Sequence, residues 1–247
     1  MGRTTPWQHS TYRLASYETS IFFQGDFLPN FQTSARRCPL FREHRIGAIP
    51  RHDRATNFVE LATGKREWID PNTGEQEMIG DPESHLPQNR FNDGKCDPAG
   101  RFFAGTLPLS EDHPGGSLYR IDHDLSIHKI LDKITISNGL CWSHDHRFFY
   151  FIDTAALRVD RFDYDISTGS IANRKTIINI DPKDGYPDGM TIDGEGMLWI
   201  AHWGGWQVTR WNPNTGEKMG NIHLPVSQVT SLCFGGENYD TLFITSA

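Results

Sequence analysis

Short apolar runs separated by polar turns recur along most of this chain. Four stretches, at 89–106, 137–154, 187–203 and 230–247, each hold a short apolar run, a polar turn and a second run rich in aromatic and branched residues. Runs of this composition predict β-strands, and the Asn, Asp and Gly residues between them predict turns. No stretch shows helical periodicity of useful length, so the pattern predicts an all-β protein.

The predicted strand pairs repeat at a steady interval. Gly47, Gly94, Gly139 and Gly189 follow one another every 45 to 50 residues. A second marker keeps the same period: PNTGE at 71–75 and at 213–217, with ISTGS at 166–170. A repeat of about 40 to 50 residues built from short strands is typical of β-propeller blades. A β-sandwich is the alternative fold, and the periodic markers favour the propeller.

The two ends of the chain depart from the repeat. Residues 1–40 contain no blade-like strand pair, and the chain stops at 247 directly after the second predicted strand of a blade. About four blades are readable and a fifth is started. We therefore expect a divergent N-terminal segment at 1–40 and a propeller domain at 41–247 that is incomplete in this chain.

Composition limits the partners of such a protein. The net charge is −7 without a basic stripe, which argues against a nucleic-acid surface. No apolar run reaches the length of a membrane helix, and no leader peptide is evident. The four cysteines are widely spaced, as expected in a reducing compartment; Cys96, Cys141 and Cys233 share one repeat position and predict small core residues of inner strands. We expect a cytoplasmic protein.

Polar residues precede the repeat glycines and form a candidate site. Asp93, Asn138 and Asp188 each stand directly before such a glycine. Because the innermost strands of propeller blades line one central channel, equivalent positions converge there. Carboxylate and amide oxygens suit a hard cation such as Ca²⁺, Mg²⁺ or Mn²⁺, whereas the lack of His and Cys disfavours structural zinc. The alternative is that each Asn-Gly or Asp-Gly pair is only a turn.

The stretch NRFNDGK carries more polar groups than a turn needs. We expect residues 93–94 to make the turn and the donors of Arg90 and Asn92 to hold an oxygen-rich ligand. Lys95 is left outside the site, because strand alternation points it away from Gly94. Arg101 is expected to lie on the surface and to make a contact between strands. His202 is expected to be a packed or rim residue, and Trp199, Trp203 and Trp206 are expected to form core between blades.

Three stretches, NRFNDGKCDPAGRFFAGT, ISNGLCWSHDHRFFYFID and PDGMTIDGEGMLWIAHWGG, resemble the gluconolactonase family that includes senescence marker protein (regucalcin). The resemblance runs from about residue 45 to 247. It implies a six-bladed β-propeller with one divalent cation (Ca²⁺, Zn²⁺, Mn²⁺ or Mg²⁺) in its channel, and hydrolysis of sugar lactones such as D-glucono-1,5-lactone.

The resemblance also implies roles for individual residues. Asn138 and Asp188 would be metal ligands, and Asp188 would also be the acid/base residue. Arg90 and Asn92 would contact the substrate, with Asp112, or alternatively Glu111, as a further acidic contact. This chemistry needs no serine nucleophile, and the chain has no GxSxG motif.

The chain departs from the family pattern at both ends. The Gly-Glu-x-Pro motif that supplies a metal-binding glutamate is absent, and Glu18 is a weak replacement candidate. The strands that close the ring in the family, and that would follow the residues TSA at 245–247, are absent too. Three functions therefore stay open: a metal-dependent lactonase, a non-catalytic calcium-binding regulatory propeller, or an inactive truncated product. The expected partner is a small sugar lactone, with no nucleic acid or membrane partner.

Overall fold

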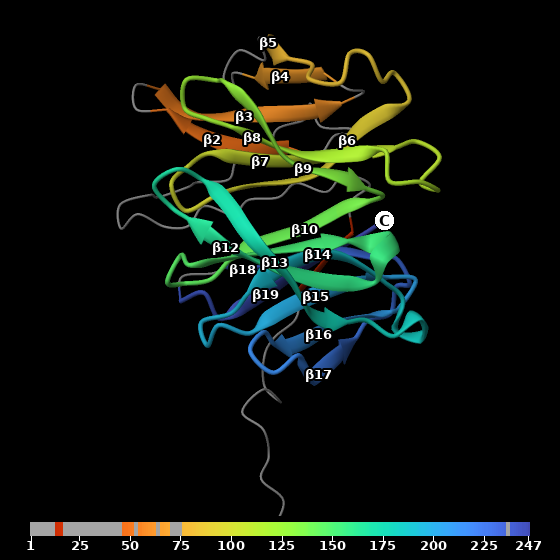
Figure 1. Ribbon diagram of the computed structural model, residues 1–247. Coiled ribbons are helices and arrows are strands. Elements are labelled where there is room, and N and C mark those ends of the chain that lie inside the picture. The colour runs from red at the N-terminus through yellow and green to blue at the C-terminus, as the bar shows by residue number, and fades with distance from the viewer. Residues whose placement is uncertain (1–12, 17–45, 52–53, 63–64, 70–75, 236–237) are drawn as a thin grey trace, which may run out of the picture.

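A computed structural model describes residues 13–16, 46–51, 54–62, 65–69, 76–235 and 238–247 (Figure 1), with side-chain surroundings from residue 80 onward. Regular structure in this part consists of strands and two single-turn 3₁₀ helices, η1 (Thr154–Ala156) and η2 (Pro182–Asp184). None of the helices described there is long and apolar enough to cross a membrane. The predicted all-β class is confirmed.

Sixteen of the strands form four antiparallel sheets of four strands, each built from consecutive segments of the chain. The first sheet holds β2 (Ile46–Arg51), β3 (Arg54–Ala62), β4 (Lys65–Ile69) and β5 (Gln76–Gly80). The second holds β6 (Asn89–Cys96), β7 (Phe102–Pro108), β8 (Gly116–Ile121) and β9 (Ile127–Ile134). The third holds β10 (Ser137–Trp142), β11 (Phe148–Asp153), β12 (Arg158–Asp165) and β13 (Ser170–Asn179). The fourth holds β14 (Tyr186–Ile192), β15 (Leu198–Trp203), β16 (Gln207–Asn212) and β17 (Glu217–His223).

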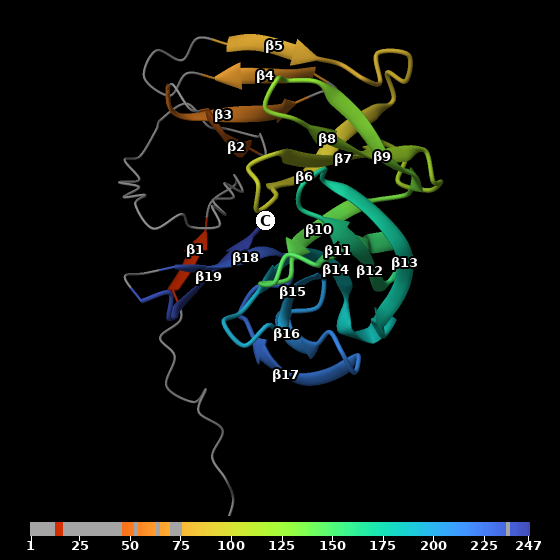
Figure 2. The same cartoon turned by 60° about the vertical axis from the view of Figure 1, so that its left-hand side comes forward.

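A fifth, three-stranded sheet follows. It pairs β18 (Val229–Gly235) antiparallel to β19 (Thr241–Ser246), whose other edge pairs parallel with β1 (Arg13–Ser16). Figure 2 shows the five sheets arranged around a shared centre, near the C-terminal end of the chain. The first strand of each four-stranded sheet is the innermost, and in the fifth sheet β18 takes this place. The inner strands β6, β10, β14 and β18 contact one another in succession. The predicted propeller is confirmed, with four full blades and part of a fifth in the described residues.

Apolar layers between neighbouring blades form the core. Phe103 and Leu118 of the second blade pack with Leu140 and Phe149 of the third. The third and fourth blades share another cluster around Ile152, Met190 and Trp211, and the fourth and fifth share one around Trp199 and Leu232. The second, third and fourth blades thus carry apolar clusters on both faces, which explains their dense aromatic and branched second strands. Trp199 is core as expected, but Trp203 and Trp206 are 36% and 52% exposed, because they lie at the loop joining β15 to β16.

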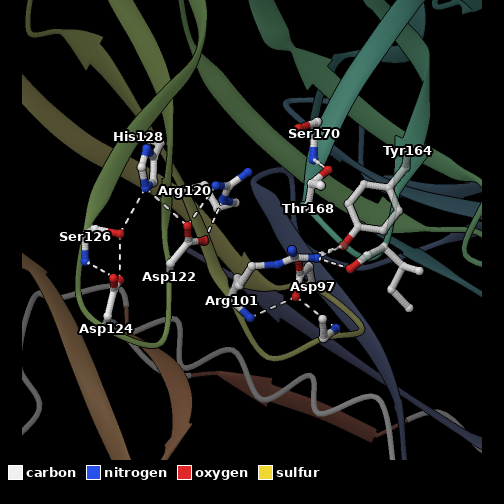
Figure 3. Close-up of polar contacts among 12 residues, drawn as sticks. Asp97, Arg101, Arg120, Asp122, Asp124, Ser126, His128, Tyr164, Thr168 and Ser170 are labelled. Carbon is white, nitrogen blue, oxygen red and sulfur yellow. Dashed lines mark hydrogen bonds and ion pairs between the residues drawn. The ribbon is translucent and has the colours of Figure 1, made fainter.

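A polar joint also links the second and third blades (Figure 3). The Arg101 guanidinium donates to the Asp97 carboxylate at 2.6 Å, to the Tyr164 hydroxyl at 2.9 Å and to the Ile166 carbonyl at 2.7 Å. Arg101 is only 6% exposed, so the expectation that it is a surface residue is wrong. Asp97, on the turn before β7, neutralises the charge of the Arg101 guanidinium, and this pairing lets the charge be buried.

The repeated turns lie at two places in the described blades, and the PNTGE marker at 71–75 lies outside the described residues. Asp97 and Asp193 each receive two backbone N–H groups at the turn between the first and second strands. Gly169 and Gly216, in the ISTGS and PNTGE markers, adopt positive φ at the outer hairpin. Residues 93–94 do not form the expected turn, because they lie inside β6 at a β-bulge. The turn follows at 97–100 instead.

Candidate functional site

A β-bulge interrupts each of the four innermost strands from β6 to β18 near its start. The ladder shifts between Phe91 and Gly94 in β6, and between Asn138 and Leu140 in β10. It shifts again between Pro187 and Met190 in β14, and at the matching place in β18. Bulges re-aim side chains. The same device therefore acts at one level of the channel in successive blades.

The ladder register decides which polar residues are equivalent. Phe91, Ser137 and Pro187 pair with Thr106, Asp153 and His202 of the second strands. The next residues along the inner strands are Asn92, Asn138 and Asp188. Alignment on the glycines placed Asp93 with Asn138 and Asp188, and the register shows that Asn92 is the equivalent residue. Asp93 instead accepts a hydrogen bond from the Gly94 amide at 2.8 Å.

The repeat glycines serve close approach between blades. A Cβ added at Gly139 would lie 2.8 Å from the Asp188 carbonyl oxygen and 2.8 Å from the Met190 Cβ. A Cβ added at Gly189 would lie 2.3 Å from the Ser231 Oγ of the next blade. Neither glycine has positive φ, so contact between neighbouring inner strands, rather than a turn, requires glycine there.

A chain of hydrogen bonds connects the site residues across blades. Arg90 Nη1 donates to Asn92 Oδ1 at 2.9 Å, and Asn92 Nδ2 donates to Asn138 Oδ1 at 3.0 Å. Asn138 Nδ2 donates to Thr154 Oγ1 at 2.8 Å, which in turn donates at 2.7 Å to the carbonyl oxygen of residue 187. The chain thus ends one residue before Asp188. Thr154 was missed in the sequence, because it stands on η1 outside the strand repeat.

The three equivalent side chains are deeply buried. Asn92, Asn138 and Asp188 are 3%, 5% and 5% exposed, respectively. Buried amides and carboxylates need partners, and the donors described above supply them for the two amides. Ser137, paired with Asp153, has a buried Oγ without a partner among the described residues.

The loop between β7 and β8 brings an acidic group to Arg90. Glu111 Oε1 lies 3.6 Å from Arg90 Nη2. Asp112 faces its neighbours instead: its Oδ1 accepts from Ser110 Oγ at 2.5 Å and contacts His113 Nδ1 at 2.7 Å. Hydrogen bonds from His113 and then Ser110 lower the pKa of Asp112. Of the two acidic candidates in this loop, Glu111 therefore lies nearer the predicted substrate arginine.

His202 lies on β15 and pairs with Pro187, the residue before Asp188. It is fully buried, and its Nε2 lies 2.6 Å from Thr209 Oγ1. Its Nδ1 has no hydrogen-bond partner among the described residues. Burial lowers the pKa of His202 to about 4. The expectation of a packed residue is confirmed, and the ring is neutral near pH 7.

The oxygen groups of Asn138 and Asp188 suit a hard divalent cation. Asn138 Nδ2 donates to Thr154, so the Oδ1 of the same amide is turned toward Asn92 and can serve as an oxygen ligand. The Asp188 carboxylate adds a negative charge. These two oxygen groups fit such a cation as ligands. In the described part of the chain, no cluster of three His, Cys, Asp or Glu side chains forms a metal site on its own. Glu18 lies outside the described residues.

Comparisons with known proteins agree with this architecture. The family model for the SMP-30/gluconolactonase/LRE-like region matches residues 29–247, beginning before the boundary expected at 41. Regucalcin from Danio rerio is 49% identical over 163 residues, which cover 65% of this chain and 55% of that protein. The chain thus spans little more than half the length of this curated relative.

Two solved structures share both the fold and more than a quarter of the aligned sequence with this chain. A luciferin-regenerating enzyme superposes with a TM-score of 0.76 at 36% identity, covering 82% of this chain and 70% of that one. A calcium-binding protein, regucalcin from Agrobacterium tumefaciens, superposes with a TM-score of 0.72 at 28% identity, covering 79% and 64%. With its bladed sheets and matched motifs, this chain belongs to the SMP-30/gluconolactonase/LRE-like family.

Proposed function

We propose that this protein hydrolyses sugar lactones with the help of one divalent cation (Ca²⁺, Zn²⁺, Mn²⁺ or Mg²⁺). The observation that carries the proposal is the hydrogen-bonded chain from Arg90 through Asn92 to Asn138, which ends beside Asp188. This chain gathers the Arg90 guanidinium, two side-chain amides and the Asp188 carboxylate at one level of the channel. Membership of a gluconolactonase-like family supports the same reaction class.

The side chains of this site have separate tasks in ester hydrolysis. Asp188 takes a proton from the attacking water and returns it to the ring oxygen that leaves. Arg90 and Asn92 bind substrate hydroxyls and orient the lactone. An acidic residue of the 109–115 loop completes this contact; the sequence favoured Asp112, and the position of Glu111 beside Arg90 supports Glu111.

Asn138 and Asp188 would hold the cation. When bound, it polarises the lactone carbonyl and lowers the pKa of water. Thr154 keeps the Asn138 amide oriented for this task, because it occupies the amide nitrogen. Glu18, which lies outside the described residues, is the predicted candidate for a further protein ligand.

The test is hydrolysis of D-glucono-1,5-lactone by the purified chain. Turnover is measured with Ca²⁺, Zn²⁺, Mn²⁺, Mg²⁺ or EDTA, beside the Asp188→Ala variant. The proposal expects metal-dependent turnover that falls by at least about 1000-fold in the variant. Absence of turnover in a protein that melts cooperatively and binds cations would refute the lactonase assignment.

A non-catalytic calcium-binding propeller is the second candidate. The Agrobacterium tumefaciens relative is described as calcium-binding, and Asp188 is the one carboxylate among the three equivalent side chains. This candidate predicts calorimetric Ca²⁺ binding without lactone turnover. A non-cooperative melt would instead favour the inactive product.

A further inference from the structure

Lys95 reaches across the channel beneath the candidate site. It stands on β6, three residues after Asn92, and is only 8% exposed. Its Nζ donates a 2.7 Å hydrogen bond to the carbonyl oxygen of Met190 on β14. These strands belong to the second and fourth blades, so the side chain spans the channel past β10. Lys95 was left outside the candidate site, and the structure places its side chain inside the ring of inner strands.

A third strand also faces this ammonium. Burial raises the pKa of the Cys233 thiol on β18, and the Lys95 charge opposes the rise. The Lys95 charge thus acts on groups from β14 and β18 as well as its own strand. It lies inside the ring of inner strands rather than on the outer surface.

Lys95 forms no direct ion pair among the described residues. The acceptor of its Nζ there is the Met190 carbonyl oxygen, which is uncharged. An ammonium offers three donors and a full charge. Most buried charges are paired, so an ammonium hydrogen-bonded to a neutral carbonyl keeps its full charge inside the ring of inner strands.

The charge stands close to the proposed cation ligands. Met190 follows Asp188 by two residues on β14, so their backbones lie within roughly 7 Å of each other. At such separations inside a protein, two positive charges repel appreciably, and salt screens buried charges weakly.

We propose that Lys95 is a fixed positive charge that weakens divalent-cation binding in the central channel. The cation site then fills only at a higher free cation concentration. This inference rests on the proposed function, in which Asn138 and Asp188 hold the cation. Removing the charge is expected to tighten cation binding about tenfold. A purely mechanical tie to Met190 predicts the opposite, since its loss would loosen the strand that carries Asp188.

Four variants of the full chain separate these roles. Lys95→Gln removes the charge and keeps a donor for Met190, Lys95→Met removes both, and Lys95→Arg keeps both. Lys175→Gln is the control, because it makes the same charge change at an exposed position on β13. Thermal melts by circular dichroism verify folding.

Calorimetric titration of metal-stripped protein with Ca²⁺ and with Mn²⁺ at constant ionic strength is the measurement. The proposal expects tighter binding in Lys95→Gln and Lys95→Met, and unchanged binding in Lys95→Arg and Lys175→Gln. Equal or weaker binding in Lys95→Gln, with a binding wild type, overturns the role of Lys95 and leaves the proposed function intact. No binding by any folded variant or the wild type overturns the cation site itself, and this inference with it.

Discussion

Asn92 donates a 3.0 Å hydrogen bond from Nδ2 to Oδ1 of Asn138, 46 residues further along the chain. Its Nδ2 also donates at 2.6 Å to the carbonyl oxygen of Ser137. Both bonds join the second blade to the third at the level of the bulges. Asn92 therefore orients the amide that is expected to bind the cation, in addition to its expected contact with substrate.

Replacement of Asn92 by alanine tests this double role. The Asn92→Ala variant should lose about 100-fold in kcat/KM for glucono-1,5-lactone, because both the substrate contact and the alignment of Asn138 are lost. Steady-state kinetics measures the effect. Asn214→Ala, on an exposed outer turn, is the control and should keep wild-type kinetics. Wild-type activity in Asn92→Ala would contradict the site.

Gly139→Ala should harm folding and activity together. The new Cβ would meet backbone and side-chain atoms of β14 beside Asp188. Overpacking of this kind costs about 1–3 kcal/mol. Urea denaturation measures the loss. Gly220→Ala, where nothing lies within 4 Å of the added Cβ, should leave the free energy of unfolding nearly unchanged.

The polar joint between the second and third blades should contribute strongly to stability. Arg101→Met leaves the buried Asp97 carboxylate without its cation, which is expected to cost about 3–5 kcal/mol. By contrast, Arg147→Met breaks an ion pair with Asp145 in which the arginine side chain is 73% exposed, and should cost under about 1 kcal/mol. Comparable losses in the two variants, measured by denaturant unfolding, would argue against the joint.

Buried neutral His202 makes stability depend on pH. Burial lowers the pKa of His202 in the folded protein to about 4, from the ordinary histidine value of 6.5. Between these values the unfolded chain binds a proton that the native ring does not, so stability falls as pH drops from 6.5 toward 4. The full effect is roughly 3 kcal/mol.

Denaturation of the wild type and His202→Gln at pH 7.5, 6.5, 5.5 and 4.5 isolates this contribution. The difference between the two proteins should shrink as the pH falls through this window. A difference that stays constant with pH would show that His202 is not the responsible group.

Two neighbouring variants decide which acidic residue of the 109–115 loop serves the substrate. Glu111→Gln should raise KM about fivefold, because Glu111 is the partner of Arg90. Asp112→Asn should leave KM unchanged, since Asp112 bonds to Ser110 and His113. The reverse order in initial-rate measurements would favour the assignment to Asp112 that the sequence suggested.

Much of the architecture was predictable from local pattern. Strand composition, turn residues and the repeat interval are properties of short segments, and they predicted an all-β propeller with four readable blades and part of another. The motifs around Arg90, Asn138 and Asp188 also predicted the family, which the comparisons confirm. The assignment of site roles to these residues stays a prediction.

The errors share one physical origin. The sequence placed 93–94 in a turn, aligned Asp93 with Asn138, put Arg101 on the surface and pointed Lys95 away from the candidate site. Each placement depends on a bulge, a ladder register or a contact between separate blades. A one-residue bulge shifts every later residue of a strand by one position, and glycine spacing does not reveal where it occurs.

The sequence by itself thus determined the strand repeat, the blade-like turns and the residue types at the channel, because these follow from local preferences and period. Only the tertiary structure decided that Asn92 is equivalent to Asn138 and Asp188, that Glu111 lies beside Arg90, and that Lys95 crosses to Met190. Those relationships join residues from different strands and blades, and packing between blades, rather than local sequence, brings them together.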